Sequence, residues 1–475
     1  MEVLVCLPSG RSASIEVPLD SRVCVLQAAA AQEFGCGIRF LVTGSCCQLN
    51  PQDALSTALT SGESVTAVVT SSILMATKRI SLAPPAGAFA LADGRKLAIW
   101  GFQKSRSLRT SRVTDLDALQ IQAGLFGFAA IRADGSVATW LCGREQHELR
   151  LTKGARCIQA SLSGFAAILC DGRVETWGHP SLDDVDLTDV THIQSNDNSF
   201  AAIRSDGSVV SWGNPERGGD TAHVQAQLTG VRHIQATKNA FAAVRADGRV
   251  VAWGLPDSGG EVPHGLSEQL RDVLSIQTSS RAFAAIRSDG RVVTWGSSSG
   301  GGDSREVQEQ LNEVQHIQAT ALAFAAIRAD GSVVTWGDPS AGGDSSAVSG
   351  QLTDVRQIQA SRCAFAALRA DERVVAWGSA SHGGDSSCVF EQLVEVQCVQ
   401  ASDHAFAAIR FDGSVVSWGS SRLGGDSSLV QEQLRSIQCI QASAGAFAAL
   451  RSDGCLVTWG CEGTGGDSRA VRECL

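Results

Sequence analysis

Tyrosine is absent from the 475 residues, and so are several features by which whole classes of protein are recognised. No apolar run approaches the ~20 residues that a membrane-spanning helix needs, so we expect no membrane partner. The first ten residues, MEVLVCLPSG, lack a basic stretch followed by an apolar one and do not resemble a secretory signal. We therefore expect the chain to act inside the cell, in the cytoplasm or the nucleus.

Excess positive charge is missing as well. The formal net charge is −10, whereas a partner with a phosphate backbone requires clustered lysine and arginine. We therefore expect no nucleic acid among the partners. The 15 cysteines are an odd number and contain no C-x-x-C pair, so we interpret them as reduced thiols, in agreement with an intracellular location.

Catalytic and metal-binding motifs are missing too. The sequence contains no P-loop, no G-x-S-x-G and no H-E-x-x-H, and its nine histidines are scattered. A Gly-Gly-Asp turn recurs, but one carboxylate per turn is too few to hold Ca²⁺, so we interpret this turn as structural. We expect no catalytic residue, no metal site and no cofactor, and hence a protein that is not an enzyme.

The sequence is instead dominated by a repeat. From Trp253 onward tryptophan recurs about every 41 residues, which is the period of one propeller blade. A phenylalanine precedes each tryptophan by eleven or twelve residues, from Phe89 to Phe447. The ten tryptophans are Trp100, Trp140, Trp177, Trp212, Trp253, Trp295, Trp336, Trp377, Trp418 and Trp459.

One unit, residues 317–344, shows the structure that the repeat encodes. We expect an inner strand at 317–319, a second strand at 324–328 and a third at 332–336, with the Asp-Gly hairpin signal between the last two. The strands are apolar on both faces, as expected where each sheet packs between two others. Phenylalanine and tryptophan would fill the space between adjacent sheets. The sequence therefore predicts an all-β fold, a β-propeller or propeller-like array of ten repeats.

The pattern A-x-R-x-D-G-x-V-x-x-W-G, at 326–337 in this unit, resembles the regulator of chromosome condensation repeat, which is shared with β-lactamase inhibitor protein II. It recurs ten times, and we assign residues 73–475 to this array. The resemblance implies a propeller, and the family closes its ring with seven blades. This chain departs from the family because Gly-Gly-Asp replaces the usual Gly-Gln-Leu-Gly after Trp-Gly. One closed ring of ten, seven blades plus three further units, and an open spiral are all possible at this point.

Residues 1–72 carry none of the repeat. We expect strands at 2–7, 14–17, 39–43 and 64–69 and a helix at 23–34. This order resembles ubiquitin, which implies a small α+β domain of the β-grasp type. The resemblance places ubiquitin's hydrophobic recognition patch on Pro8, Leu41 and Val69. No Gly-Gly tail follows Val69, so we expect an integral docking domain, with a generic β-grasp cap as the alternative.

Positions that are identical in all units build the scaffold, so a partner should be recognised where the units differ. Two stretches vary, one between the inner and second strands and one after Trp-Gly. In an up-down-up blade both fall on one face, and the uniform Asp-Gly turns, such as that of Asp330, fall on the other. The predicted partner-binding residues are Phe126, Asn198, Lys238, Arg281, Leu322, Arg362 and His404.

These features indicate a monomeric, non-catalytic scaffold that binds a protein partner, with a link to ubiquitin pathways through its first domain. The alternatives are a guanine-nucleotide exchange factor for a small GTPase, as in the founding family, and an accessory part of a ubiquitin ligase that lacks its own catalytic domain. No residues are left outside the two domains to form a catalytic domain. No loop stands out as an insertion that would carry exchange activity.

Overall fold

A computed structural model describes residues 154–162, 164–177 and 186–468. Before residue 154 it describes short segments, at 2–6, 12–16, 40–43, 65–68, 72–76, 89–93, 96–100, 112–115, 118–124, 127–132, 135–141 and 147–149.

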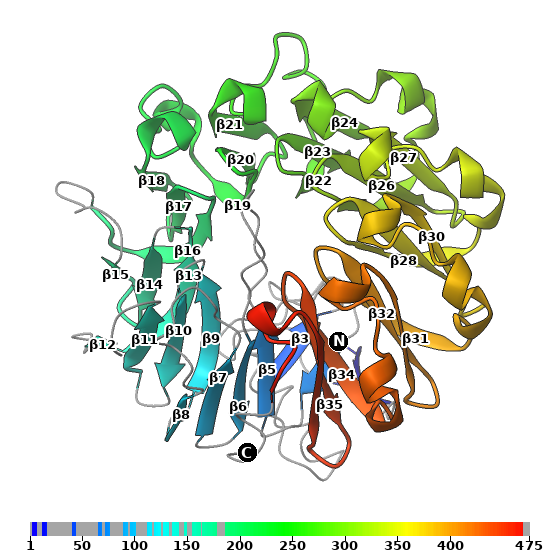
Figure 1. The fold of residues 1–475 in the computed structure, drawn as a ribbon. Helices are drawn as coiled ribbons and strands as arrows, with labels where there is room; N and C mark the ends of the chain where they lie inside the picture. Colours follow the sequence, from blue (N-terminus) through cyan, green and yellow to red (C-terminus); the bar gives the residue numbers. More distant parts are fainter. Residues whose placement is uncertain are drawn as a thin grey trace.

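Ten small antiparallel sheets follow one another along the chain and form a ring (Figure 1). Each sheet is one blade, and blades 1 to 10 run in chain order from β5–β8 to β34–β36. In each blade the first strand lies nearest the centre of the ring and the third lies farther out (Figure 1). The inner strand of blade 10, β34, lies beside the inner strand of blade 1, β5. Of the three arrangements that were possible, the chain thus adopts one ring of ten blades.

The strands of the blades have the following bounds. The inner strands are β5 (Ser72–Ala76), β9 (Ala118–Gly124), β13 (Ala155–Ala160), β16 (Val190–Ser195), β19 (Val231–Ala236), β22 (Val273–Thr278), β25 (Val314–Ala319), β28 (Val355–Ala360), β31 (Val396–Ala401) and β34 (Ile437–Ala442). The second strands are β6 (Phe89–Asp93), β10 (Gly127–Arg132), β14 (Phe165–Leu169), β17 (Ser199–Arg204), β20 (Ala240–Arg245), β23 (Ala282–Arg287), β26 (Ala323–Arg328), β29 (Ala364–Arg369), β32 (Ala405–Arg410) and β35 (Ala446–Arg451). The third strands are β7 (Lys96–Trp100), β11 (Val137–Leu141), β15 (Val174–Trp177), β18 (Val209–Gly213), β21 (Val250–Gly254), β24 (Val292–Gly296), β27 (Val333–Gly337), β30 (Val374–Gly378), β33 (Val415–Gly419) and β36 (Leu456–Gly460). Blades 1 and 2 have a fourth strand, β8 (Arg112–Asp115) and β12 (His147–Leu149).

Blade 7 shows how the repeat forms its sheet. Strand β26 pairs with β25 on one side and with β27 on the other, and Phe324 lies directly opposite Trp336. Gly331 turns the chain between β26 and β27 with a φ of +76°, a conformation that suits glycine. The inner strand begins three residues earlier than expected, at Val314, because a bulge between Val314 and His316 extends the pairing. The predicted strand order and hairpin are confirmed.

Short 3₁₀-helices follow the third strand, where the sequence predicted only turns. The helix directly after the third strand is η1 (Pro215–Arg217), η3 (Pro256–Ser258), η4 (Ser298–Gly300), η6 (Pro339–Ala341), η8 (Ala380–His382), η10 (Ser421–Leu423) or η12 (Glu462–Thr464). A second one is η2 (Gln225–Gln227), η5 (Arg305–Gln310), η7 (Ser346–Gln351), η9 (Ser387–Gln392) or η11 (Ser428–Gln433). In the described part of the chain, no helix is long and apolar enough to cross a membrane.

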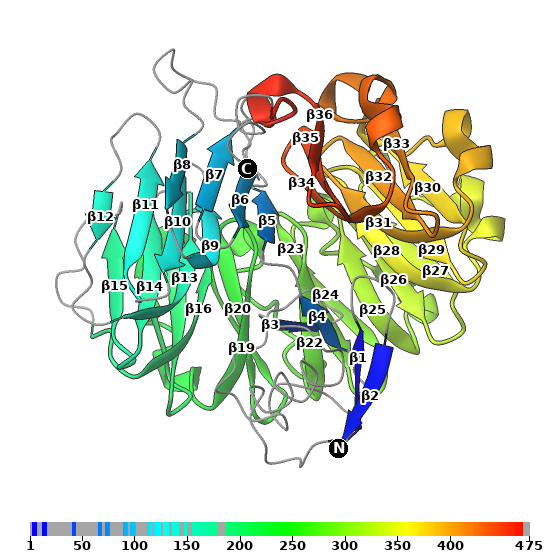
Figure 2. The same cartoon turned by 90° about the horizontal axis from the view of Figure 1, so that it is seen from below.

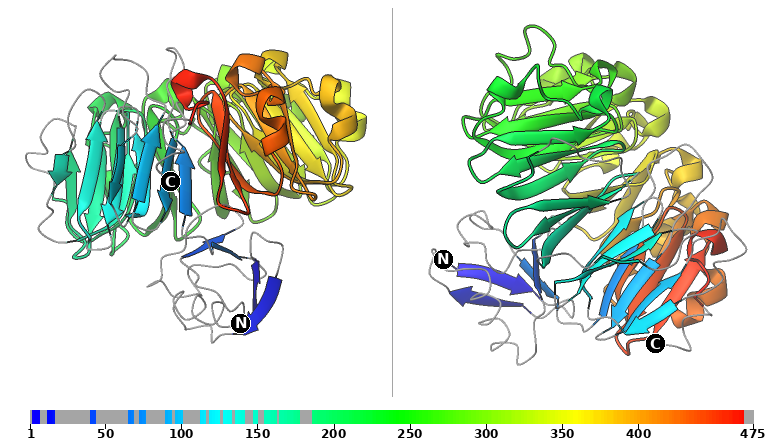
Figure 3. Two further views of the ribbon diagram at one scale, coloured as in Figure 1. Left: turned by 60° about the horizontal axis from the view of Figure 1, so that its bottom comes forward. Right: turned by 90° about the vertical axis from the view of Figure 1, so that its left-hand side faces the viewer.

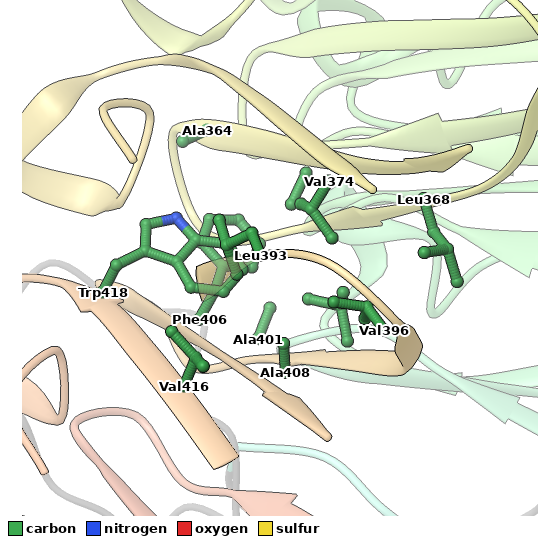
Figure 4. Packing of buried hydrophobic residues seen from close by; sticks show 12 residues of the cluster. Ala364, Leu368, Val374, Leu393, Val396, Ala401, Phe406, Ala408, Val416 and Trp418 are labelled. Carbon is green, nitrogen blue, oxygen red and sulfur yellow. The ribbon is translucent and has the colours of Figure 1, made fainter. Parts of the chain in front are cut away.

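The core consists of layers of side chains between neighbouring blades. In the layer between blades 8 and 9, Leu368 and Val374 of blade 8 pack with Phe406, Ala408 and Trp418 of blade 9 (Figure 4). Alternate residues of the second strand face opposite neighbours, which explains why these strands are apolar on both faces. Phe406 and Trp418 stack with ring centroids 5.2 Å apart, and both are almost fully buried. The expected position of the tryptophans between blades is confirmed.

A separate four-stranded sheet precedes the ring, in the order β2-β1-β4-β3. Its strands are β1 (Glu2–Cys6), β2 (Ser12–Glu16), β3 (Phe40–Thr43) and β4 (Val65–Val68), and β1 pairs with β4 in parallel. The helix expected at 23–34 lies outside the described residues. Only residues 69–71 separate β4 from the inner strand β5, and inner strands begin at the Asp-Gly side of the ring. The sheet therefore lies on that side, away from the 3₁₀-helices (Figures 2 and 3).

Candidate functional site

The two variable stretches of each blade lie together on one face of the ring, hereafter the variable face. In blade 7 the chain turns there at residues 320–322, between β25 and β26, and again at 338–344, after β27. The backbone N–H of Asp338 donates to the carbonyl of Leu322 at 3.0 Å and joins the two turns. The equivalent bond recurs in each blade from 4 to 10. Asp330 lies at the other end of the same strands, on what we call the Asp-Gly face.

A buried side chain fixes these two turns to each other in each of blades 4 to 8 and in blade 10. In blade 7 it is Thr320, whose hydroxyl accepts from the N–H of Ala323 and donates to the carbonyl of Ala341, both at 3.0 Å. We call this position the pin residue. Sequence analysis missed it, although a short polar side chain here in unit after unit was a visible signal. The buried residues at this position in blades 3 to 10 are Ser161, Asn196, Thr237, Ser279, Thr320, Ser361, Ser402 and Ser443.

Two variable residues follow the pin and form the tip of a tight hairpin. In blade 7 the N–H of Thr320 donates to the carbonyl of Ala323 at 2.9 Å, so Ala321 is the first tip residue and Leu322 the second. The N–H of the first tip residue donates to the carbonyl of the first tip residue of the next blade, as from Ala321 to Arg362 at 2.9 Å. We call the series of these bonds the tip ladder. It runs from blade 3 to blade 10 through Leu162, Asp197, Lys238, Ser280, Ala321, Arg362, Asp403 and Ala444.

The tip ladder separates the predicted partner-binding residues into two kinds. Lys238 and Arg362 are first tip residues and belong to the ladder. The second tip residues contact the turn that follows the third strand of their own blade through a backbone hydrogen bond; they are Asn198, Arg281, Leu322 and His404. The sequence had assigned all of them to the variable stretch between the inner and second strands, without this distinction.

For four of the residues predicted to bind a partner, the structure describes no side chain. Phe126, Pro8 and Val69 lie outside the described residues. Leu41 belongs to β3, where its backbone pairs with that of Ala67.

The ring brings charged side chains of different blades within electrostatic range of one another. Burial is the main cause that lowers the pKa of Lys238, in blade 5. Asp197 opposes this shift, and Arg362 of blade 8 adds to it. Arg281 also lowers the pKa of Lys238, while Asp403 raises it. This electrostatic coupling links blades 5 and 8, which are not adjacent in the ring.

Two histidines stack on this face, one from each of two adjacent blades. The rings of His382 and His404 have centroids 4.6 Å apart. Burial is the largest cause that lowers the pKa of His404, to about 4, and the nearby His382 and Arg362 lower it further. The pKa of His382 is lowered as well, mainly by burial. Both imidazoles are therefore neutral at pH 7.

The Gly-Gly-Asp turn supports the packing between blades. In blade 8 a Cβ at Gly383 would lie 2.6 Å from Cδ2 of Phe406, and the carbonyl of Gly383 accepts the indole N–H of Trp418 at 3.0 Å. Asp385 accepts from the N–H of Ser387, the first residue of η9, at 2.9 Å. The turn thus contributes to the packing between blades 8 and 9. In the part of the chain that the structure describes, no three histidine, cysteine, aspartate or glutamate side chains are grouped as metal ligands would be.

Comparisons with known proteins show a likeness in fold only. Neither the protein-family models nor the curated proteins contain a match. Among solved structures, a chain of the complex of Kap60 with yeast RCC1 (Prp20) is 13% identical, with 79% of this chain and 87% of that chain covered and a TM-score of 0.34. Human WBSCR16 is 13% identical, with 74% and 98% covered and a TM-score of 0.33. Prp20p from Saccharomyces cerevisiae, described with its binding to Gsp1p and histones, is 14% identical, with 55% and 82% covered and a TM-score of 0.31. These values are low, so the assignment of a repeat propeller depends on the strand pairing described above.

Proposed function

We propose that this chain is a non-catalytic scaffold that binds a protein partner on its variable face. One observation carries the proposal: successive blades hold their tips with the same backbone bonds, while the two tip residues differ from blade to blade. Variable side chains on a rigid framework are the usual arrangement of a recognition surface. The Asp-Gly face, by contrast, presents the same turn in blade after blade and offers a partner little to distinguish.

The pin residues support this proposal because they hold the tips in one conformation, although burial of a polar side chain is in itself unfavourable. Each pin buries a polar side chain, which is unfavourable unless its hydrogen bonds are made. Thr237, Ser279 and Ser361 all bond across to the other turn, at 2.9, 2.7 and 2.8 Å. A rigid tip loses little conformational entropy when it binds.

A photo-crosslinking experiment tests the proposal. We would place p-benzoylphenylalanine at Leu322 on the variable face and, as a control in the same blade, at the exposed Ala329 beside the Asp-Gly turn. We expect a specific protein adduct from Leu322 in cells and none from Ala329. Adducts from Ala329 alone would refute the assignment of the face.

A mutational test follows for the partner so identified. Replacing Arg281 and Arg362 together by alanine should weaken its binding at least tenfold, which is about 1.4 kcal/mol, because arginine is a frequent anchor of interfaces. Asp330→Asn should leave the affinity unchanged, because Asp330 lies on the Asp-Gly face. The opposite result would place the binding surface on the other side of the ring.

We further propose that residues 1–72 form a ubiquitin-like docking domain. The sheet supports this proposal, because its two central strands, β1 and β4, are parallel. Parallel strands require a long crossover connection, and the helix expected at 23–34 would lie in the segment that connects β1 to β4. Leu41→Ala should weaken binding to an isolated ubiquitin-receptor domain in a titration. Unchanged binding would leave the generic β-grasp cap as the better interpretation.

We place this function inside the cell. The exposed Cys170, Cys388 and Cys455 carry free thiols. Reduced thiols at exposed positions suit a reducing compartment. Fractionation of cells that express the full chain would test this, and recovery in the medium would contradict it.

A further inference from the structure

Four consecutive blades present a basic arc on the variable face. The arc consists of Lys238 in blade 5, Arg281 in blade 6, Leu322 in blade 7 and Arg362 in blade 8. Arg281 is exposed, and the other three are half-buried. Acidic tip residues bound the arc at both ends, Asp197 in blade 4 and Asp403 in blade 9.

The arginines of the arc differ from those on the opposite side of the same blades. On the Asp-Gly face of blades 5 to 10, the arginine that ends the second strand pairs with the aspartate of its own turn, as in Arg287–Asp289 at 3.2 Å and Arg369–Asp371 at 3.4 Å. Within the described residues, neither arginine of the arc forms an ion pair. Their effect on Lys238 is instead that of like charges, which disfavours the protonated amine. The free protein therefore holds these positive charges near one another, and Asp197 and Asp403 oppose them at the two ends of the arc.

We propose that the basic arc binds an acidic peptide segment of the protein partner, with one apolar side chain of that segment covering Leu322. The inference rests on the proposed function of the variable face. Arginine pairs with a carboxylate through two parallel hydrogen bonds, so two arginines with an apolar side chain between them fit alternating acidic and apolar residues. The flanking Asp197 and Asp403 oppose a longer polyanion. The net charge of −10 opposes a nucleic acid in the same way.

The test uses a labelled synthetic peptide of glutamates around one leucine, with fluorescence anisotropy as the readout on the full chain. Arg281→Ala combined with Arg362→Ala should weaken binding roughly tenfold, which is about 1.4 kcal/mol. The matched control is Arg291→Ala combined with Arg373→Ala. It removes two exposed arginines from the Asp-Gly face of the same two blades, 6 and 8, and should leave affinity unchanged. A glutamine-for-glutamate peptide should bind at least tenfold more weakly than the acidic one.

Three results would overturn the proposal: an equal loss in both double variants, equal binding of the glutamine peptide, or tighter binding of a single-stranded oligonucleotide of the same charge. The crosslinking at Leu322 separates these failures from failure of the proposed function. If Leu322 still gives a specific adduct while the acidic peptide does not bind, the variable face is retained and the acidic partner is rejected. If Leu322 gives no adduct, both fall.

Discussion

Two tryptophans in equivalent places should respond differently to the same substitution. Trp336 and Trp212 are 4% and 2% exposed, and each stacks on the phenylalanine opposite, with centroids 5.2 and 5.3 Å apart. The indole N–H of Trp336 donates to the carbonyl of Gly301 in the preceding blade at 3.0 Å. The indole nitrogen of Trp212 is buried without a hydrogen-bond partner among the described residues. The sequence offers a reason, because the segment after Trp177 in blade 3 lacks the Gly-Gly pair.

Replacement by phenylalanine separates the hydrogen bond from the packing. Trp336→Phe leaves the buried carbonyl of Gly301 unpaired, which costs about 1–3 kcal/mol, whereas Trp212→Phe removes a donor that has no partner among the described residues. The loss of ring area is the same in both and cancels in the comparison. We therefore expect Trp336→Phe to lower the free energy of unfolding by about 2 kcal/mol more than Trp212→Phe does.

Urea denaturation followed by circular dichroism would measure the difference, with unchanged m-values as the check that the same unfolding is observed. Trp336→Ala provides the reference for loss of the whole side chain, at about 3–5 kcal/mol. Costs for the two phenylalanine variants that agree within about 0.5 kcal/mol would refute the reasoning, since that is the usual scatter between independent sites.

Three further predictions concern single residues. Ser361→Ala should cost about 1–3 kcal/mol in a denaturant titration, because Ser361 bonds to the carbonyl of His382 at 2.8 Å and is buried. Glu372→Gly should raise the free energy of unfolding by about 0.5–1 kcal/mol, because Glu372 has a φ of +65° where the other blades have glycine; a loss of stability would contradict this. The folded pKa of His404, about 4, lies below its unfolded value, so the unfolded chain binds more protons and stability falls as the pH drops from about 6.5 to 4. His404→Asn should flatten the dependence of the free energy of unfolding on pH between about pH 6.5 and 4. An unchanged slope would contradict the lowered pKa of His404.

The blade was predictable because its signals are local. Asp330 and Gly331 give the hairpin, and the apolar residues on both strand faces indicate a sheet packed on both sides. The 3₁₀-helices were not predicted. In a segment such as Arg305–Gln310 only Val307, together with the following Leu311, packs against the core, and two apolar positions are too few to define a helical period.

Ring closure and the tip ladder were beyond sequence reasoning for another reason. The contact of β34 with β5 joins parts of the chain more than 350 residues apart, and nothing in either strand specifies the partner. In the same way, the difference between the first and second tip residues depends on the neighbouring blade. Lys238 and Arg281 look alike in the sequence, but only the backbone of Lys238 takes part in the ladder.

Every sheet of the ring consists of consecutive strands, including the sheets of blades 1 and 10. The two ends of the array therefore meet as separate blades, and no sheet among the described strands is assembled from both ends of the chain. In such a repeat, stability is the sum of blade terms and nearest-neighbour terms, so the seam between β34 and β5 is one boundary among ten. A circular permutant that joins the end of blade 10 to the start of blade 1, and opens the chain between blades 5 and 6, would keep all ten sheets. The chain could therefore begin and end between any two neighbouring blades of this ring.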